Sequence, residues 1–191
     1  MTLWIKARRT TTVILPALAV FAVVAVSGHN QYAELPSLVA VSGNRVFLMQ
    51  LAPLLITSAL GYSLTQRLPE IEATARRDMR LLDAALVTAV VAAGAVASVA
   101  VGVLADAEEA TMAGRNLLFL TGLMLIARRI HEQAATVVPA AWVFVVMFVG
   151  HRSFQQPWIW AVTLHPAHVM PTLAFSLAVF AAGLGAHFTT R

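Results

Sequence analysis

The feature that most constrains this chain is a series of long apolar runs. A bilayer core about 30 Å thick needs roughly 20 apolar residues at the rise of an α-helix. Six stretches reach or approach this length: residues 11–27, 46–65, 81–104, 112–126, 136–149 and 170–186. A barrel strand would instead alternate over about ten residues, so these runs predict helices. We expect an all-α, polytopic integral membrane protein with six transmembrane helices in one domain, residues 1–191. The fourth and fifth runs are short, and we expect each to extend by a turn.

The composition excludes an ordinary soluble domain. Hydrophobic residues make up 59% of the 191 residues and charged residues only 12%, where a soluble domain carries roughly a quarter. The chain has no cysteine, which excludes disulfides, thiolate metal sites and thiol redox motifs. A net charge of +4 would suggest nucleic acid for a soluble protein. Here the position of the charges matters more, so we expect membrane lipid and no nucleic acid as a partner.

The positions of Lys and Arg predict the orientation. With the N-terminus inside, ten basic residues fall on inner segments: Lys6, Arg8, Arg9, Arg67, Arg76, Arg77, Arg80, Arg128, Arg129 and Arg191. Only Arg45 and Arg152 fall on outer segments, and the outer stretch 105–110 is acidic. Because cytoplasmic loops carry an excess of basic residues, both termini are expected in the cytoplasm and the protein in the cell (plasma) membrane. The first run resembles a signal peptide, but it is longer than a usual signal core, so we expect it to be retained as a span.

Two segments outside the spans have the character of interfacial helices. Trp4 and Ile5 beside three cations predict an N-terminal helix lying in the inner interface, although a charged flank that only sets orientation would look the same. Residues 68–80 (LPEIEATARRDMR) place Pro69 and acidic residues first and arginines last, which suits a helix dipole. This pattern predicts an amphipathic helix that docks on a soluble partner, the alternative being a solvated charged loop. The residues expected to carry the docking are Leu68, Glu70, Ile71, Glu72, Arg76 and Met79.

Polar residues inside the spans are rare. Arg115, with Asn116, is the strong charge that lies well inside a predicted helix, and an intramembrane Arg costs about 3 kcal/mol or more on insertion scales. It is therefore a candidate for a polar interior or substrate path, with Glu108 or Glu109 as possible partners. The alternative is that Arg115 snorkels to the outer interface. Asp83 begins the third span, where it is expected to pair with Arg80 or cap the helix.

Small residues recur in the third span at four-residue spacing. Gly94, Ser98 and Gly102 would lie on one helix face, and small residues allow close approach of helices in lipid. Such a stripe usually marks packing within one chain, and a subunit interface is the alternative.

The outer segment 151–170 is rich in aromatic residues. It contains Phe154, Trp158 and Trp160, with prolines at 157 and 166, and is too short and interrupted to span. We expect an interfacial or re-entrant helix. The spacing of His165 and His168 resembles that of metal ligands, but no acidic ligand accompanies them. We therefore expect no metal. Because no catalytic set and no phosphate-binding Gly-rich loop occurs, we expect that the chain itself is not an enzyme.

The layout resembles the permease subunit of ABC-2-type exporters. The stretches LPEIEATARRDMRLLD (residues 68–83) and AGRNLLFLTGLMLIARR (residues 113–129) are similar to those of small actinobacterial membrane proteins of this kind. The resemblance implies an elbow helix at the N-terminus, a coupling helix at 68–80 that docks on an ABC-type ATPase, and outer re-entrant helices that close the exit. It also implies a second permease chain, ATP and Mg bound by the partner ATPase, no cofactor bound by this chain, and outward movement of a hydrophobic or amphipathic substrate. The chain is shorter than is usual for the family.

Two alternatives to an exporter remain at this stage. The chain could be a non-transporting membrane anchor or assembly subunit of a larger complex. A small intramembrane lipid-modifying enzyme is the third interpretation, and the lack of clustered acidic or histidine residues within the spans counts against it.

Overall fold

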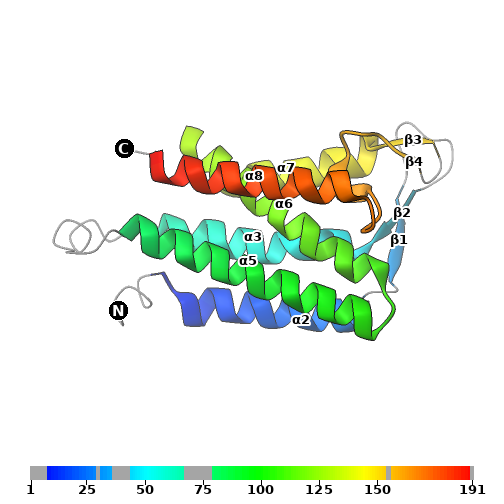
Figure 1. The fold of residues 1–191 in the computed structure, drawn as a ribbon, viewed down its shortest axis with the longest axis horizontal. Coiled ribbons are helices and arrows are strands. Elements are labelled where there is room, and N and C mark those ends of the chain that lie inside the picture. The colour runs from blue at the N-terminus through cyan, green and yellow to red at the C-terminus, as the bar shows by residue number, and fades with distance from the viewer. Residues whose placement is uncertain (1–7, 29–30, 36–43, 67–78, 154–155, 190–191) are drawn as a thin grey trace.

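The protein is a bundle of helices that run along one long axis (Figure 1). The computed structural model describes residues 8–28, 31–35, 44–66, 79–153 and 156–189. Its helices are η1 (Thr10–Ile14), which continues into α2 (Leu15–Gly28), then α3 (Leu48–Thr65), α5 (Met79–Leu104), α6 (Glu108–Ile130), α7 (Ala134–Val149) and α8 (Met170–Thr189). The start of η1 and the end of α8 lie at the same end of the bundle.

Each predicted apolar run is confirmed as a helix, with boundaries that differ by a few residues. The fourth run extends at both ends, to Glu108–Ile130, whereas the fifth gains only two residues, at Ala134–Val149. Four helices in the described part of the chain are long and apolar enough to cross a bilayer: Thr10–Gly28, Met79–Leu104, Glu108–Ile130 and Met170–Phe188. Neither α3 nor the shorter α7 is among these four. These apolar helices fit a membrane protein.

The expectation of a wholly helical chain is incomplete, because two short hairpins connect helices. Between α2 and α3, strand β1 (Tyr32–Leu35) pairs antiparallel with β2 (Asn44–Phe47), so that Tyr32 lies opposite Phe47. Residues 46 and 47, expected in the second span, therefore belong to a strand. Strand pairing satisfies the backbone N–H and C=O groups of a connection, and hydrophobicity alone does not distinguish such a strand from the start of a helix.

The helix expected in residues 151–170 is not observed in the described part of this segment. In the described part of this segment, strand β3 (His151–Ser153) pairs with β4 (Gln156–Pro157), and one 3-10 turn, η2 (Val162–Leu164), follows. Pro157 and Pro166 have no N–H to donate, which opposes a continuous helix. The expected N-terminal helix and most of the expected docking helix lie outside the described residues. Of the docking residues, Met79 is described, and it is the first residue of α5.

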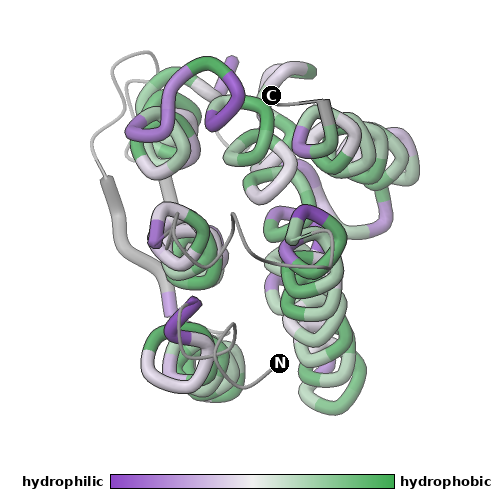
Figure 2. Tube along the Cα trace, turned by 90° about the vertical axis from the view of Figure 1, so that its left-hand side faces the viewer, coloured by the Kyte–Doolittle hydropathy of each residue, from purple (hydrophilic) through white to green (hydrophobic). Residues whose placement is uncertain are grey.

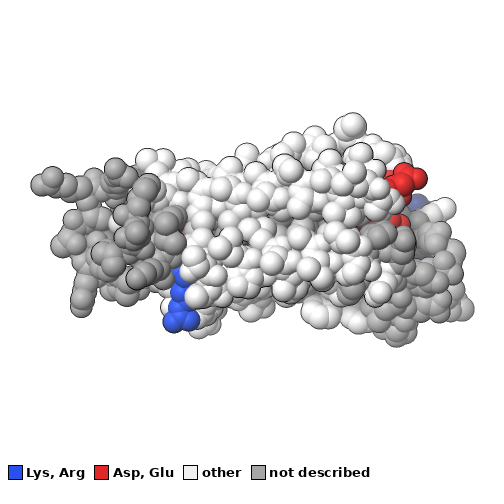
Figure 3. All heavy atoms as spheres, turned by 90° about the horizontal axis from the view of Figure 1, so that it is seen from below, with Lys and Arg blue, Asp and Glu red and all other residues white. Residues whose placement is uncertain are grey.

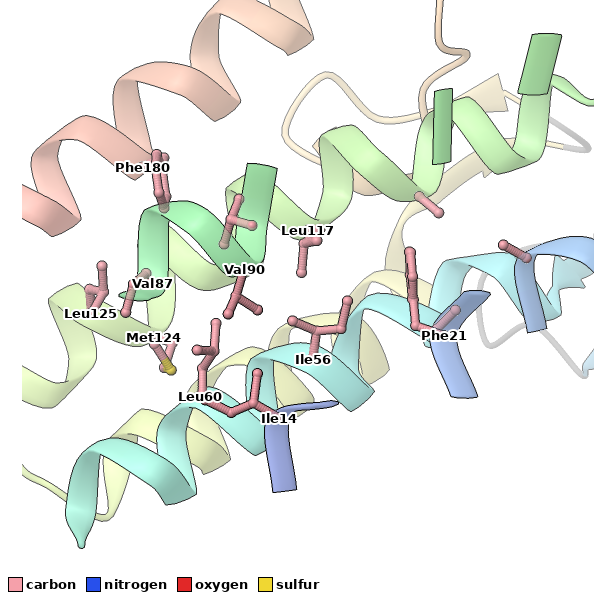
Figure 4. Close-up of a cluster of buried hydrophobic side chains, with 14 of the residues drawn as sticks. Ile14, Phe21, Ile56, Leu60, Val87, Val90, Leu117, Met124, Leu125 and Phe180 are labelled. Carbon is pink, nitrogen blue, oxygen red and sulfur yellow. The ribbon is translucent and has the colours of Figure 1, made fainter. Parts of the chain in front are cut away.

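Helix α6 is the centre of the bundle. It packs against α3, α5, α7 and α8, and Figure 1 shows it running obliquely between them. The buried core contains apolar side chains from most of the helices (Figure 4), among them Phe21, Ile56, Leu60, Val87, Val90, Leu117, Met124 and Phe180. Acidic residues in the first turn of α6 and arginines in its last turn suit its dipole.

The outer surface of the bundle is also apolar. Large hydrophobic side chains are exposed on several helices, including Val23 on α2, Val96 on α5, Phe144 on α7 and Phe175 on α8. Figure 2 shows the helices predominantly in the hydrophobic colour when they are seen nearly end on. In Figure 3 the charged side chains of the described residues lie near the two ends of the visible face, with an uncharged belt between them. Such a belt fits the hydrocarbon of a bilayer.

Candidate functional site

Polar side chains gather in two places, one at each end of the bundle. The end that carries Arg8, Asp83 and Arg128 is called the Arg8 end below. The opposite end, at which α6 begins and which carries Arg115, is called the Arg115 end.

A two-pronged ion pair lies at the Arg8 end. The Nε of Arg8 donates to Oδ1 of Asp83 at 2.9 Å, and its Nη2 donates to Oδ2 at 2.6 Å. Both residues are buried, with 3% of Arg8 and 5% of Asp83 exposed. Paired N–H groups that match the two oxygens of a carboxylate make a geometrically specific contact. The pair joins Arg8, two residues before η1, to the first turns of α5.

Two arginines also bind the last turn of α3. Arg8 Nη1 donates to the carbonyl oxygens of Leu64 at 3.2 Å and Gln66 at 2.9 Å. Arg128, in the last turn of α6, donates from Nη2 to the same Leu64 oxygen at 2.6 Å. The last carbonyls of a helix have no partner within the helix, and cations favour that end of the dipole. Arg8 and Arg128 therefore cap α3 from two directions.

The network at the Arg8 end holds both flanks of segment 67–78. Leu64 and Gln66 precede this segment, and Asp83 follows it by a few residues. Ser63 strengthens the connection by donating from Oγ to the Arg8 carbonyl at 2.6 Å. The α3 and α5 flanks of the segment are thus tied to each other, to the N-terminal residues and to α6.

Arg115 is the centre of the second polar group. It is 4% exposed, and its guanidinium makes four hydrogen bonds, all to neutral oxygens. Nη1 donates to the Pro166 carbonyl and to Thr172 Oγ1, both at 2.9 Å, and Nη2 donates to the His165 carbonyl at 2.7 Å and to Asn116 Oδ1 at 3.1 Å. Arg115 is therefore enclosed by protein and is not snorkelling to the interface.

Asn116 binds the same segment at a position two residues before His165. Its Nδ2 donates to the Thr163 carbonyl at 2.9 Å, and both residues are buried. Carbonyl groups outside regular structure need donors when water is excluded. Arg115 and Asn116 supply these donors, and their hydrogen bonds attach residues 163–172 to α6.

Neither Glu108 nor Glu109 makes a hydrogen bond or close ion pair with Arg115 in the described part of the chain, although the charge of Glu108 acts on Arg115 from a greater distance. Glu108 Oε1 instead accepts from the Ala167 N–H at 3.0 Å and contacts His168 Nδ1 at 2.9 Å. The side chain of Arg115 points toward residues 163–172, which bring several carbonyls within its reach. Glu108 thus gives a second attachment for the same segment, at an exposed position.

The histidines at the Arg115 end have separate environments. His168 contacts Glu108, whereas the Nε2 of His165 lies 3.1 Å from the Trp158 carbonyl. Among the described residues, no three His, Asp or Glu side chains are grouped to hold a metal ion. His151, in β3, is buried, and this burial lowers the pKa of its imidazole.

The small residues singled out in the third span lie on the side of α5 that faces α6. A Cβ added to Gly94 would lie 2.5 Å from a Leu117 side-chain carbon, and one added to Gly102 would lie 2.1 Å from Thr111 Oγ1. Ser98 is fully buried, and its Cβ lies 3.0 Å from the position of a Cβ on Gly114. In this structure the stripe formed by Gly94, Ser98 and Gly102 packs within the chain.

Sequence reasoning missed the network at the Arg8 end. The sequence indicates Arg8 and Arg128 only as part of the basic asymmetry, and it predicts a local role for Asp83. The one available signal was a lone acidic residue at the start of an apolar run, which implies a basic partner without identifying it. No family model, curated protein or solved structure matches this chain.

Proposed function

We propose that this chain is the membrane-embedded permease subunit of an ATP-driven exporter of the ABC type. In this proposal all six helices cross the membrane, the Arg8 end is cytoplasmic, and separate ATPase subunits bind ATP and Mg. The chain itself catalyses no reaction and binds no cofactor. The substrate is a hydrophobic or amphipathic molecule that moves outward.

The observation that carries the proposal is the network of Arg8, Asp83 and Arg128. A subunit driven by a separate ATPase needs a cytoplasmic segment that is mechanically joined to its spans. The residues on both sides of 67–78 are joined by buried, charge-assisted hydrogen bonds to α5, α6 and the N-terminal residues. The sequence of 68–80 supports docking, because it has an apolar stripe and charges ordered to suit a helix dipole.

The packing around α6 supports a substrate path between two chains. Apolar side chains such as Leu117, Leu120 and Met124 fill the space between α6 and its neighbours. Cores of this kind are close-packed, so the middle of one chain is poorly suited to passage of a large apolar substrate. We therefore include a second permease chain, identical or homologous, in the proposed complex.

Co-purification with an ATP-binding subunit tests the proposal. The tagged chain is purified from membranes of its own cells, and bound polypeptides are photolabelled with an azido analogue of ATP. We expect a labelled subunit with the unaltered chain and loss of that subunit from the double variant Ile71→Asp, Met79→Asp. Ile130→Asp is the matched control, because Ile130 is an exposed apolar residue at the same end but outside 68–80.

Absence of any ATP-binding subunit would reject the exporter. An unlabelled protein partner in its place would favour a non-transporting anchor or assembly subunit. If the double variant kept its ATPase, the docking role of 68–80 would be wrong.

A further inference from the structure

A hydrophobic loop projects from the bundle at the Arg115 end. It consists of Trp158, Ile159 and Trp160, and we call it the WIW loop. Ile159 is 90% exposed, and the flanking Trp158 and Trp160 are 40% and 39% exposed. A group of large apolar side chains exposed together usually marks a contact surface.

The WIW loop has a fixed conformation. The Trp158 N–H donates to the Gly150 carbonyl at 2.8 Å, and the Trp158 carbonyl accepts from the Ala161 N–H at 2.9 Å. The His165 ring also lies 3.1 Å from that carbonyl. These contacts hold Ile159 outward, so its exposure is a property of the folded segment.

The Trp160 side of the WIW loop packs against α7. The Trp160 ring meets the Trp142 ring of α7 edge to face, with centroids 6.1 Å apart. Trp142 lies seven residues before the end of α7, which corresponds to about 10 Å at helical rise. The Trp142 ring also contacts Phe119, which contacts Phe175 on α8. The loop is therefore continuous with the apolar packing between α6, α7 and α8.

Helix α7 is short for a transmembrane helix. Its 16 residues span about 24 Å at 1.5 Å per residue, which is less than the roughly 30 Å of a bilayer core. The WIW loop adds apolar surface beside α7 at the Arg115 end, because Trp158 is bound to Gly150, directly after the end of α7, and Trp160 meets Trp142.

We propose that the WIW loop lies in the headgroup region of the bilayer at the Arg115 end and completes the lipid-facing side of α7. Trp side chains favour this region, because they combine an apolar ring with a polar N–H. The Arg152 guanidinium lies 5.4 Å from the centroid of the Trp158 ring, a position from which it can also bind a lipid phosphate. The occupant of this surface is phospholipid. The inference rests on the bilayer placement of the proposed function and is independent of the ATPase.

Site-directed spin labelling of the cysteine-free chain tests the inference. A nitroxide is attached to Ile159→Cys in nanodiscs of phosphatidylcholine and phosphatidylglycerol, and its collisions with oxygen and with a nickel chelate are measured. Val96→Cys, on the exposed side of α5, is the control for the hydrocarbon core. Asp106→Cys, in the exposed turn between α5 and α6, is the control for water.

The expected result is an intermediate depth. The label at Ile159 should lose most of the nickel collisions seen at Asp106 and should have fewer oxygen collisions than the label at Val96. Nickel collisions equal to those at Asp106 would show that the loop is in water and would overturn the inference. A depth equal to that of Val96, or protection from both reagents by a protein partner, would also overturn it. Loss of ATPase association in the preceding experiment would leave this result unaffected.

Discussion

Arg8 and Asp83, 75 positions apart in the sequence, form a buried ion pair with two short hydrogen bonds at one end of the bundle. The pair brings the N-terminal residues, the end of α3 and the start of α5 to one place. Burial of an ion pair is costly, and the pair is maintained because the remaining guanidinium hydrogens find carbonyl partners. With Arg128 of α6 on the same Leu64 oxygen as Arg8, the Arg8 end joins four parts of the chain.

Asp83→Asn should be strongly destabilising. The substitution leaves the Arg8 charge buried without its carboxylate, and breaking one partner of a buried pair typically costs about 3–5 kcal/mol. Thermal unfolding in detergent, followed by tryptophan fluorescence, should show a clear fall in Tm. Asp106→Asn makes the same chemical change at an exposed turn and should leave Tm nearly unaltered. A small and equal effect in both variants would contradict the structural role of the pair.

Arg115→Leu should release residues 163–172 without preventing membrane insertion. The variant removes all four hydrogen bonds of the guanidinium, so the His165 and Pro166 carbonyls lose their donors. Because the chain has no natural cysteine, Thr163→Cys, at a buried position, reports this release by its rate of maleimide labelling. The rate should rise in the Arg115→Leu background. Arg129→Leu, at the opposite end of α6, should not change it, and equal rates in all backgrounds would refute the attachment.

Gly183→Ala should destabilise the contact of α8 with α6. A Cβ at Gly183 would lie 2.7 Å from the Gly122 carbonyl oxygen and 3.0 Å from its Cα. Both atoms are backbone, so relief requires separation of the helices, and overpacking of this kind costs about 1–3 kcal/mol. Gly185→Ala is the control on the same helix, since its Cβ would meet nothing within 4 Å. Similar Tm values for the two variants would show that α6 and α8 do not approach so closely.

The stability should fall in mild acid because of His151. Burial lowers its folded-state pKa from the ordinary value of 6.5. Below about pH 6.5 the unfolded chain binds a proton at this residue, whereas the folded chain remains neutral until a lower pH is reached. The stabilisation is thus present above 6.5 and is lost as the pH falls toward the folded-state pKa.

Melting curves at successive pH values test this effect. His151→Asn should have a flatter dependence of Tm on pH between 6.5 and the folded-state pKa. His131→Asn, at an exposed position near the other end, should retain the full slope. An unaltered slope in His151→Asn would assign the dependence to another group.

The positions of the helices could be predicted from the sequence, whereas their contacts could not. Long apolar runs predict helices because lipid leaves the backbone few alternatives. The same runs do not distinguish a side facing lipid from a side facing protein, since both are apolar. That is why α6 was not recognisable as the enclosed helix, and why the strand at Asn44–Phe47 was partly assigned to a span.

The polar sites show a similar limit. Arg115 was recognised from its residue type and position, but three of its partners are carbonyls or a hydroxyl that carry no signal in the sequence. The Arg8–Asp83 pair depends on how α3, α5 and η1 assemble, which no local pattern specifies. Residues 151–170 are rich in aromatic residues, but Pro157 and Pro166 oppose the helix that this composition suggests.

The six-span orientation is tested most directly by cysteine labelling across each helix connection. Single cysteines are placed at five exposed or partly exposed positions: Gln31, Gln66, Asp106, Gln133 and Arg152. A membrane-impermeant maleimide is applied to intact cells and then to permeabilised cells. We predict labelling of Gln31, Asp106 and Arg152 in intact cells, and of Gln66 and Gln133 only after permeabilisation. Two consecutive positions labelled from the same side would show that the helix between them does not cross the membrane, and would contradict the account.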